Sequence, residues 1–265
     1  MWHNNREIPN QAIDRGLQFG DGHFTTLTIE NGVPRWWSAH WQRLQEASRR
    51  LAMLLPEQAE LLGCIKRLIE QHPQQNLVVK IIVTRGEGSR GYGAEVQSQA
   101  NWYLKASPLP TRTTVPLNVA VAAIPLSRSP LLAGLKSLNR LEQVMLSQEK
   151  QQRQLDELIV LDTAGNVIEA ISSNLLWRKG RQWFTPSLEY AGIAGVVRRQ
   201  LLEQQPVDLQ IVDAVSVNEF LQAEQVVLTN SVLGLRPVAQ IGEHRLCDPH
   251  LPKALKSWWH ESDVS

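Results

Sequence analysis

The sequence predicts a mixed α+β protein with two domains, and three observations support this class. Apolar runs of strand length occur in both halves of the chain. Segments with helical spacing lie between them, as at 38–54, where apolar residues recur every three or four positions. A polar stretch rich in proline and threonine at 107–116 separates the two halves. We therefore expect a smaller N-terminal α+β domain at 1–106, an interdomain linker at 107–116, and a larger C-terminal domain at 117–265 with a mixed sheet and helices.

The N-terminal half begins with a predicted hairpin. Asn31 and Gly32 form its turn signal, because both residue types tolerate the positive φ angles of a tight hairpin. A helix should then start at about Ser38 and end near Pro56. The rest of this half is predicted as a helix at 58–72, a strand at 76–86, a glycine-rich loop at 85–95 and a strand at 101–107.

The C-terminal half alternates predicted strands and helices. A strand at 117–124 precedes a helix that starts near Leu138, where apolar residues return at helical spacing. Asn139, with Glu142 three residues later, resembles a capping signature, so Lys136 is expected just before the first turn. The remaining elements are strands at 156–162, 167–180 and 181–186, a helix within 192–205, a strand at 209–215, a helix at 216–223 and a strand at 224–231.

Composition and charge argue against several classes of protein. A formal net charge of +1 gives no support for binding nucleic acid or an anionic membrane surface. Cys64 and Cys247 lack metal-ligand spacing and do not suggest a disulfide framework. The N-terminus lacks the layout of a signal peptide, and no apolar run approaches the roughly 20 residues of a membrane-spanning helix. We expect a soluble, cytoplasmic protein without a bound metal ion.

Two charged residues stand in apolar surroundings. Lys136 follows a Gly-Leu step and precedes the predicted helix, and an ordinary surface lysine is the alternative interpretation. Glu169 lies within the predicted strand at 167–180, among valine, isoleucine and alanine. A carboxylate there is costly to bury without a partner, and the alternative is that it faces water.

Two further segments have the chemistry of an anion site. The glycine-flanked pair Ile193-Ala194 directly precedes a helix, where backbone N–H groups are free to bind a phosphate. Thr229 and Asn230 end an apolar strand, as residues that line ligand sites often do. Ordinary turns use the same residue types in both places. An amine, a carboxylate and a phosphate cradle are together the groups that a pyridoxal 5′-phosphate enzyme needs.

Five motifs spread over nearly the whole chain carry a family resemblance: RGLQFGDGHFTT, SAHWQRLQEASRRL, TRGEGSRGYG, LLAGLKSLNRLEQV and VIEAISSNLLWRKG. They resemble those of the fold type IV pyridoxal-phosphate-dependent enzymes, the branched-chain aminotransferase-like family. The resemblance implies a two-domain fold, pyridoxal 5′-phosphate as the cofactor, and a homodimer. It assigns Lys136 as the catalytic lysine that bonds to the cofactor, Arg43 as a phosphate ligand and Glu169 as the partner of the pyridine nitrogen.

The phosphate cup departs from the family pattern. Aminotransferases of this family typically have Gly-Ile/Val-Thr-Arg there, whereas this chain has glycine, isoleucine, alanine and glycine at 192–195. Only the backbone N–H groups of Ile193 and Ala194 are therefore expected to bind phosphate. Arg43, Thr229 and Asn230 are expected to supply the other contacts.

Within the family, the lysine segment matches the carbon–oxygen lyases closely. The resemblance implies conversion of 4-amino-4-deoxychorismate to 4-aminobenzoate and pyruvate, a step of folate biosynthesis. The alternative is an amino-acid aminotransferase of the branched-chain or D-amino-acid type, which would share the fold, the cofactor, Lys136 and Glu169. Because the lyase substrate carries two carboxylates, cations should line its site. Arg90 is the candidate, with a solvated loop arginine as the alternative, and His23 is expected to be a packing or surface residue.

Overall fold

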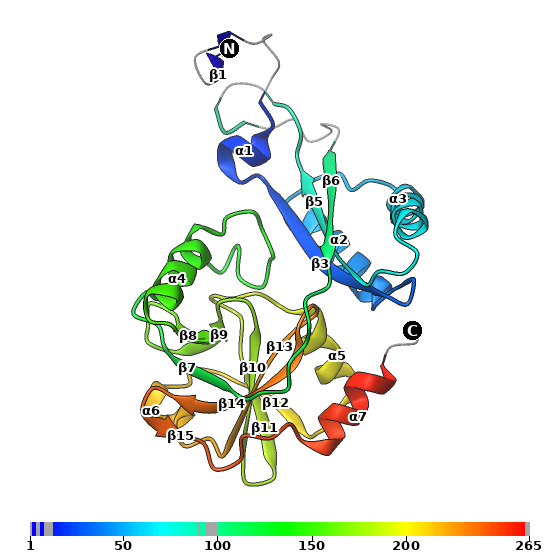
Figure 1. Ribbon diagram of the computed structural model, residues 1–265. Coiled ribbons are helices and arrows are strands. Elements are labelled where there is room, and N and C mark those ends of the chain that lie inside the picture. The colour runs from blue at the N-terminus through cyan, green and yellow to red at the C-terminus, as the bar shows by residue number, and fades with distance from the viewer. Residues whose placement is uncertain (1, 4–5, 8–12, 89–90, 94–99, 263–265) are drawn as a thin grey trace.

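The computed structural model describes residues 2–3, 6–7, 13–88, 91–93 and 100–262. Figure 1 shows an upper part, formed by residues 13–108, and a lower part, formed by residues 117–262, each with its own sheet. At the N-terminus, β1 (Trp2–His3) and β2 (Arg6–Glu7) pair only with each other. The predicted mixed α+β class is confirmed.

The upper part is a four-stranded antiparallel sheet backed by two helices. The strand order is β4–β3–β5–β6, with β3 at Gly22–Glu30, β4 at Val33–Pro34, β5 at Leu77–Thr84 and β6 at Asn101–Pro108. Helices α2 (Trp37–Arg50) and α3 (Gln58–Gln71) pack Leu44, Leu61 and Ile65 against the apolar face of the sheet. A short helix, α1 (Arg15–Phe19), precedes β3.

The hairpin between β3 and β4 has the predicted turn. Asn31 and Gly32 both adopt positive φ angles, 52° and 78°, and β3 pairs with β4 in an antiparallel register on either side of them. The turn chemistry alone was sufficient to predict this connection.

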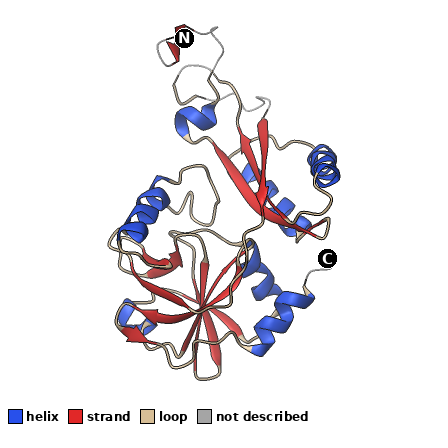
Figure 2. Cartoon of the chain, in the orientation of Figure 1, coloured by secondary structure: helices blue, strands red, loops and turns tan. Residues whose placement is uncertain are grey.

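The lower part is a mixed sheet of nine strands that fan out around a common centre in Figure 2. The strand order is β12–β11–β10–β13–β14–β7–β8–β9, with β15 paired to β14. The parallel pairs are β11 with β12, β14 with β7 and β7 with β8. The strands are β7 at Leu117–Val121, β8 at Glu157–Leu161, β9 at Val167–Ala170, β10 at Asn174–Lys179, β11 at Gln182–Pro186, β12 at Leu209–Val212, β13 at Gln225–Asn230, β14 at Gly234–Ile241 and β15 at His244–Arg245.

Helices lie around this sheet, at the periphery of the lower part (Figure 2). They are α4 at Leu141–Gln152, α5 at Val196–Gln204, α6 at Val217–Phe220 and α7 at Lys253–Glu261. Helix α7 packs Trp258 and Trp259 against Trp36 of the upper part, with ring centroids 5.9 and 5.1 Å apart. The C-terminal helix therefore joins the two parts through an aromatic contact. None of the helices in the described ranges is long and apolar enough to cross a membrane.

The start of α4 differs from the prediction. The helix begins at Leu141 with Arg140 as its N-cap, and no side chain caps it. The predicted cap, Asn139, instead lies against Gly20, where a Cβ atom on the glycine would come within 2.4 Å of the Asn139 Oδ1. The contact with a distant glycine has replaced the local capping interaction. The apolar residues whose helical spacing predicted this helix face outward. Leu141, Val144 and Met145 are exposed, and Leu146 is the buried residue of the helix.

The segment predicted as one strand at 167–180 is two strands. β9 and β10 are separated by a tight turn in which the backbone groups of Ala170 and Ser173 bond to each other. β9 then pairs with β8, whereas β10 pairs with β11 and β13. The turn places Glu169 close to a change of strand direction, at the rim of the lower sheet. The elements α1, β14, β15 and α7 had no counterpart in the sequence prediction.

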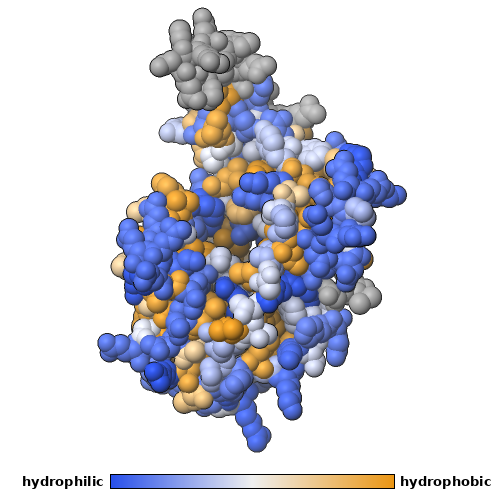
Figure 3. Space-filling view, in the orientation of Figure 1, coloured by the Kyte–Doolittle hydropathy of each residue, from blue (hydrophilic) through white to orange (hydrophobic). Residues whose placement is uncertain are grey.

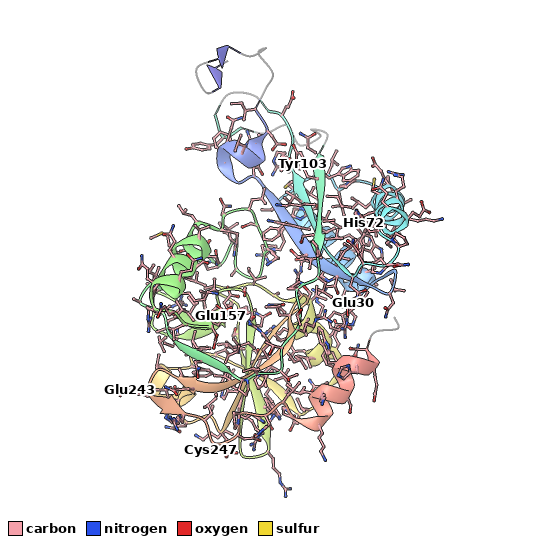
Figure 4. The ribbon with its side chains drawn as sticks, viewed as in Figure 1. Glu30, His72, Tyr103, Glu157, Glu243 and Cys247 are labelled. Atoms are coloured by element: carbon pink, nitrogen blue, oxygen red, sulfur yellow. The ribbon has the colours of Figure 1, made fainter. Side chains whose placement is uncertain are left out.

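The two parts are joined by the segment 109–116, which has no regular structure and overlaps the predicted linker. Arg112 in this segment forks onto the carboxylate of Glu30 with two bonds of 2.7 Å and donates a third bond to the carbonyl of Val232. Figure 4 shows Glu30 at the end of the upper sheet that lies nearest the lower part. The boundaries of the two domains stay a prediction.

We predict that Leu61→Ala lowers the free energy of unfolding by about 2–5 kcal/mol, because it opens a cavity in the core under the upper sheet. Leu61 is fully buried, whereas Leu54 is 47% exposed. Leu54→Ala is therefore the control and should cost roughly 1 kcal/mol or less. Urea unfolding of the two variants measures the difference, and equal losses would contradict this description of the core.

Candidate active site

A cavity of about 360 Å³ lies where the upper and lower parts meet. Figure 3 shows a hollow between the two parts, with apolar residues on its walls. The cavity brings together six of the predicted site residues, although they come from segments far apart in the sequence: Arg43, Lys136, Glu169, Ile193, Thr229 and Asn230. Ala194 does not line it, and Arg90 lies outside the described residues.

Lys136 lies in an extended segment that is bonded on both sides. Its carbonyl accepts a hydrogen bond from the N–H of Phe24 on β3, at 2.9 Å. Two residues earlier, Gly134 exchanges backbone bonds with Gly192 and Ala194. The Nζ atom lies 4.6 Å from the centroid of the Phe24 ring. The lysine is therefore held at a fixed place in the cavity wall rather than on a mobile surface loop.

The surroundings of Lys136 favour its neutral form. Burial lowers the pKa of its amine to about 7, and repulsion from the Arg43 guanidinium acts in the same direction. The attraction of the Glu169 carboxylate opposes both effects. An amine that is partly neutral near pH 7 can act as a nucleophile or as a base.

Glu169 is a buried carboxylate, 3% exposed, at the end of β9. Its Oε2 accepts a 2.8 Å bond from the N–H of Ile193. Burial raises the pKa of this carboxyl to about 7, against the opposing effects of the Ile193 bond and of the cations Arg140 and Lys136. Within the described residues, Oε1 accepts no hydrogen bond. This oxygen remains available to a partner in the cavity.

The start of α5 differs from the predicted phosphate cup. The N–H of Ile193 is bonded to Glu169, and the N–H of Ala194 donates to the carbonyl of Gly134 at 3.0 Å. Both N–H groups are therefore bonded within the chain here, and the role of Ile193 and Ala194 at the phosphate stays a prediction. The helix begins two residues later, and its geometry leaves the N–H groups of Val196 and Val197 without acceptors inside the helix.

Asn174 fixes the chain in front of this helix. Its side chain donates to the Ile193 carbonyl at 2.8 Å and accepts from the Gly195 N–H at 3.0 Å. A Cβ atom at position 195 would lie 2.0 Å from the Asn174 Oδ1, so a larger residue there would displace the Asn174 side chain. The second glycine of the motif therefore allows the close approach of Asn174.

Among the described residues of the cavity wall, two buried polar atoms lack hydrogen-bond partners. They are Nε of Arg43 and Oγ1 of Thr229, and such atoms are costly unless a ligand or water satisfies them. Burial lowers the pKa of the Arg43 guanidinium to about 10, and Arg199 nearby adds repulsion. A guanidinium, a hydroxyl and free N–H groups at a helix start fit a phosphate dianion. The donor set thus fits the phosphate of the implied cofactor.

Asn230 lines the cavity, but its side chain is bonded to the protein. Its amide nitrogen donates to Ser172 and Ser173, and its oxygen accepts from the N–H groups of Val232 and Leu233. These bonds use the donor and acceptor groups of the side chain to shape the loop that follows β13. The Asn230 side chain is therefore not available as a phosphate ligand.

Lys80 lies near Lys136, although it does not line the cavity, and the sequence analysis missed it. It opposes Thr26 and Lys105 in the ladder of β3, β5 and β6, and its Nζ lies 4.2 Å from the centroid of the Phe24 ring. Burial and the charge of Lys105 lower the pKa of Lys80. A lysine inside the apolar run of β5 was the signal that could have identified it.

His23 is a packing residue, which agrees with one of the two expectations for it. It is 1% exposed, and its Nε2 is bonded to the Ser48 hydroxyl at 2.8 Å. Burial lowers the pKa of its imidazole to about 4. The described residues contain no group of three or more His, Cys, Asp or Glu side chains that could hold a metal ion.

Comparison with known proteins identifies the family of the chain. A sequence model of the family described as Amino-transferase class IV matches residues 22–241. The chain belongs to this family. It is 32% identical to an aminodeoxychorismate lyase of Vibrio harveyi over 86% of each chain, and 29% identical to a D-alanine aminotransferase of Bacillus licheniformis over 86% of this chain and 81% of the relative. A crystal structure of 4-amino-4-deoxychorismate lyase from Pseudomonas aeruginosa is 35% identical and superposes with a TM-score of 0.84, covering 98% of this chain and 96% of that one.

In the cofactor-free protein, we predict that a small amine-reactive reagent modifies Lys136 with a pH profile whose midpoint lies near pH 7. The ordinary lysine pKa of 10.5 would place the midpoint much higher. Below the midpoint the amine is protonated and unreactive, and above it the neutral amine reacts. Arg43→Gln removes a repelling charge and should move the midpoint upward. Reductive methylation followed by peptide mass spectrometry measures the profile, with the exposed Lys256 in the same digest as a control for the reagent. A wild-type midpoint near 10.5 would contradict the burial of this amine.

Proposed function

We propose that the protein is a pyridoxal-phosphate-dependent lyase that converts 4-amino-4-deoxychorismate to 4-aminobenzoate and pyruvate. The observation that carries this proposal is similarity over almost the whole chain to lyases named for that substrate, at 32% and 35% identity. The cavity adds support, because a lysine, a carboxylate and a phosphate-binding donor set meet in it. The D-alanine aminotransferase at 29% identity makes transamination of an amino acid the second candidate.

We assign the chemistry at the amine to Lys136 and Glu169. When bound, pyridoxal phosphate supplies an electron-accepting ring that stabilises negative charge beside the substrate nitrogen. Lys136 is the residue that bonds to the cofactor, and its amine, once released, removes the proton from C4 of the substrate. Its lowered pKa leaves part of the amine neutral near pH 7 for this step. Glu169 holds a proton at the pyridine nitrogen through its free oxygen.

We assign the phosphate to the donors at the start of α5 and their neighbours. Arg43 supplies a guanidinium, Thr229 a hydroxyl, and Val196 and Val197 their backbone N–H groups. All four residues line the cavity. This set replaces the Ile193 and Ala194 donors expected from the sequence.

We assign one substrate carboxylate to Lys80. Its amine and that of Lys136 both lie against the Phe24 ring, at 4.2 and 4.6 Å from its centroid, so they are near neighbours. Neither Lys80 nor Lys105 forms an ion pair with any residue that the structure describes. A dianionic substrate would supply the missing negative charge, with Arg90 as a further candidate from the glycine-rich loop.

The product decides between the two candidate reactions. With 4-amino-4-deoxychorismate as the substrate, we expect stoichiometric pyruvate and 4-aminobenzoate, and Lys136→Ala should form neither product. In parallel, D-alanine with 2-oxoglutarate should give no glutamate above the level of that variant. A coupled pyruvate assay and chromatography of the amino acids measure both outcomes. Rapid glutamate formation without 4-aminobenzoate would favour the aminotransferase.

We predict that Arg43→Gln weakens cofactor binding by about 10- to 100-fold, because a charge-assisted contact of this kind contributes roughly 1.5–3 kcal/mol. Thr229→Val should weaken binding less, by roughly 2- to 10-fold, since it removes one neutral hydrogen bond. Arg43→Lys should recover part of the loss, because lysine keeps the positive charge but cannot donate two parallel hydrogen bonds as a guanidinium does. Titration of the cofactor-free protein, followed by absorbance, gives the three dissociation constants. Unchanged affinity in Arg43→Gln would place the phosphate elsewhere.

We also propose that the protein is a cytoplasmic homodimer. Large apolar side chains are exposed on and beside α4, namely Leu131, Leu141, Val144 and Met145, with exposed fractions of 45–85%. An apolar helix face of this kind is typical of a subunit interface. Cys64 and Cys247 are both unpaired, which suits a reducing compartment.

The double variant Leu141→Glu with Val144→Glu should therefore sediment as a monomer at concentrations where the wild type is a dimer. Burying two carboxylates in an apolar interface is costly, which is the reason for the expected dissociation. Ile211→Glu on β12 is the control, because Ile211 is also apolar and 53% exposed but lies on a different element. A wild-type protein that sediments as a monomer would contradict the proposed dimer.

A further inference from the structure

A second cavity, of about 210 Å³, shares Arg43, Lys136 and Val196 with the main one. Its other walls are α2, the segment 134–135 and residues 194–199. It is therefore a neighbour of the proposed phosphate site, on the side of the chain that faces α2. The proposed reaction does not use this cavity.

The walls of this second cavity carry an excess of positive charge. Arg43, Arg50 and Arg199 line it, and Glu46 is the one acidic residue in its described lining. Glu46 bonds to Arg49 at 2.9–3.2 Å and also attracts Arg50 and Arg199, so the lining holds three guanidinium groups against one carboxylate. Three guanidinium groups around a small cavity repel one another unless an anion lies between them.

The hydrogen-bonding groups of these arginines are not all used. Arg43 lines both cavities, and because its unpartnered Nε is assigned to the cofactor phosphate, it adds positive charge here rather than a free donor. Among the described residues, Arg199 makes a single long bond of 3.4 Å, to Gln42. Arg50 is fixed in place by the carbonyls of Leu131 and Ala133 at 2.9 Å, which hold its guanidinium at the cavity wall. Donors that are positioned but unsatisfied are a site for an acceptor with several oxygens.

We propose that this cavity is a second oxyanion site, which binds a phosphate dianion, free or as the terminal group of an ester, in addition to the cofactor phosphate. Arg199 and Arg50 are its own ligands, and Arg43 is shared between the two sites. The proposal concerns anion binding and not catalysis, so it does not depend on which reaction the enzyme catalyses.

Ala194 gives a way to test the site without removing a ligand. Its side chain is exposed and lines this cavity. The Ala194 Cβ lies beside Gly134, since a Cβ built on that glycine would be 3.8 Å from it. Ala194→Asp adds a carboxylate at the cavity wall that should repel a bound anion. Ala194→Asn has nearly the same shape without the charge, so the pair separates an electrostatic effect from a steric one.

The experiment measures binding of radiolabelled orthophosphate to the cofactor-loaded enzyme by equilibrium dialysis, with glycerol 2-phosphate as a competitor that represents esters. We expect the wild type to bind one phosphate per chain saturably. Arg199→Gln should lower the affinity for phosphate by about 10- to 100-fold. Ala194→Asp should cause a comparable loss of affinity, whereas Ala194→Asn should not. Arg181→Gln, which removes an exposed arginine of the β10–β11 turn, is the control and should change the affinity by about twofold or less. Competition by glycerol 2-phosphate would show that the site accepts esters, and lack of competition that it accepts the free ion.

The proposal is overturned if the loaded enzyme shows no saturable phosphate binding. It is equally overturned if Arg199→Gln and Arg181→Gln weaken binding alike, since that result would indicate general charge screening rather than a site. Each variant should keep the cofactor content and circular dichroism of the wild type. A failure of the proposed lyase activity would leave these binding results unchanged, so the two proposals fail separately.

Discussion

The extended segment 134–138 is held by four backbone hydrogen bonds, two to β3 and two to the chain in front of α5. The N–H of Phe24 and the carbonyl of Gly22 bond to this segment on one side, and Gly192 and Ala194 bond to Gly134 on the other, at 2.9–3.0 Å. The upper part and the phosphate-binding end of the lower part therefore meet along one short strand-like segment, with Lys136 in its middle. The bonds from the N–H groups of Ala194 to Gly134 and of Gly195 to Asn174 explain why the free N–H groups begin at Val196.

This arrangement determines the electrostatics of the cavity. Lys136 and Glu169 are both removed from water, and burial pushes the pKa of each toward neutrality from opposite directions. Their mutual attraction favours the charged forms, whereas Arg43 favours a neutral lysine. The balance leaves an amine that can lose its proton and a carboxyl that can hold one. A site with these properties suits chemistry in which a proton moves to and from the substrate near pH 7.

The sequence was informative where function depends on a residue and its immediate neighbours, and less so where it depends on contacts between distant segments. Lys136, Glu169, Arg43 and Thr229 were all selected from motifs and meet in one cavity. The bonds that the N–H groups of Ile193 and Ala194 make could not be predicted, because their acceptors come from segments more than twenty residues away in the chain.

Three other errors arose because the sequence does not show which distant segments pack against one another. Asn139 does not cap α4, because its side-chain amide lies against Gly20. The apolar residues of α4 are exposed, because helical spacing cannot distinguish a face in the core from an exposed one. Lys80 was missed because its neighbours Thr26 and Lys105 lie on other strands. Strand register, which places these residues side by side, depends on the whole sheet and cannot be read from one segment.

The identity of the lysine that bonds to the cofactor tests the central claim most directly. The loaded enzyme is reduced with borohydride, digested and mapped by mass spectrometry. The position of Lys136 beside Glu169, between β3 and the start of α5, predicts a single pyridoxyl group on Lys136, and none in Lys136→Ala. A pyridoxyl group on Lys80 or Lys105 of the wild-type enzyme would contradict the assignment of this site.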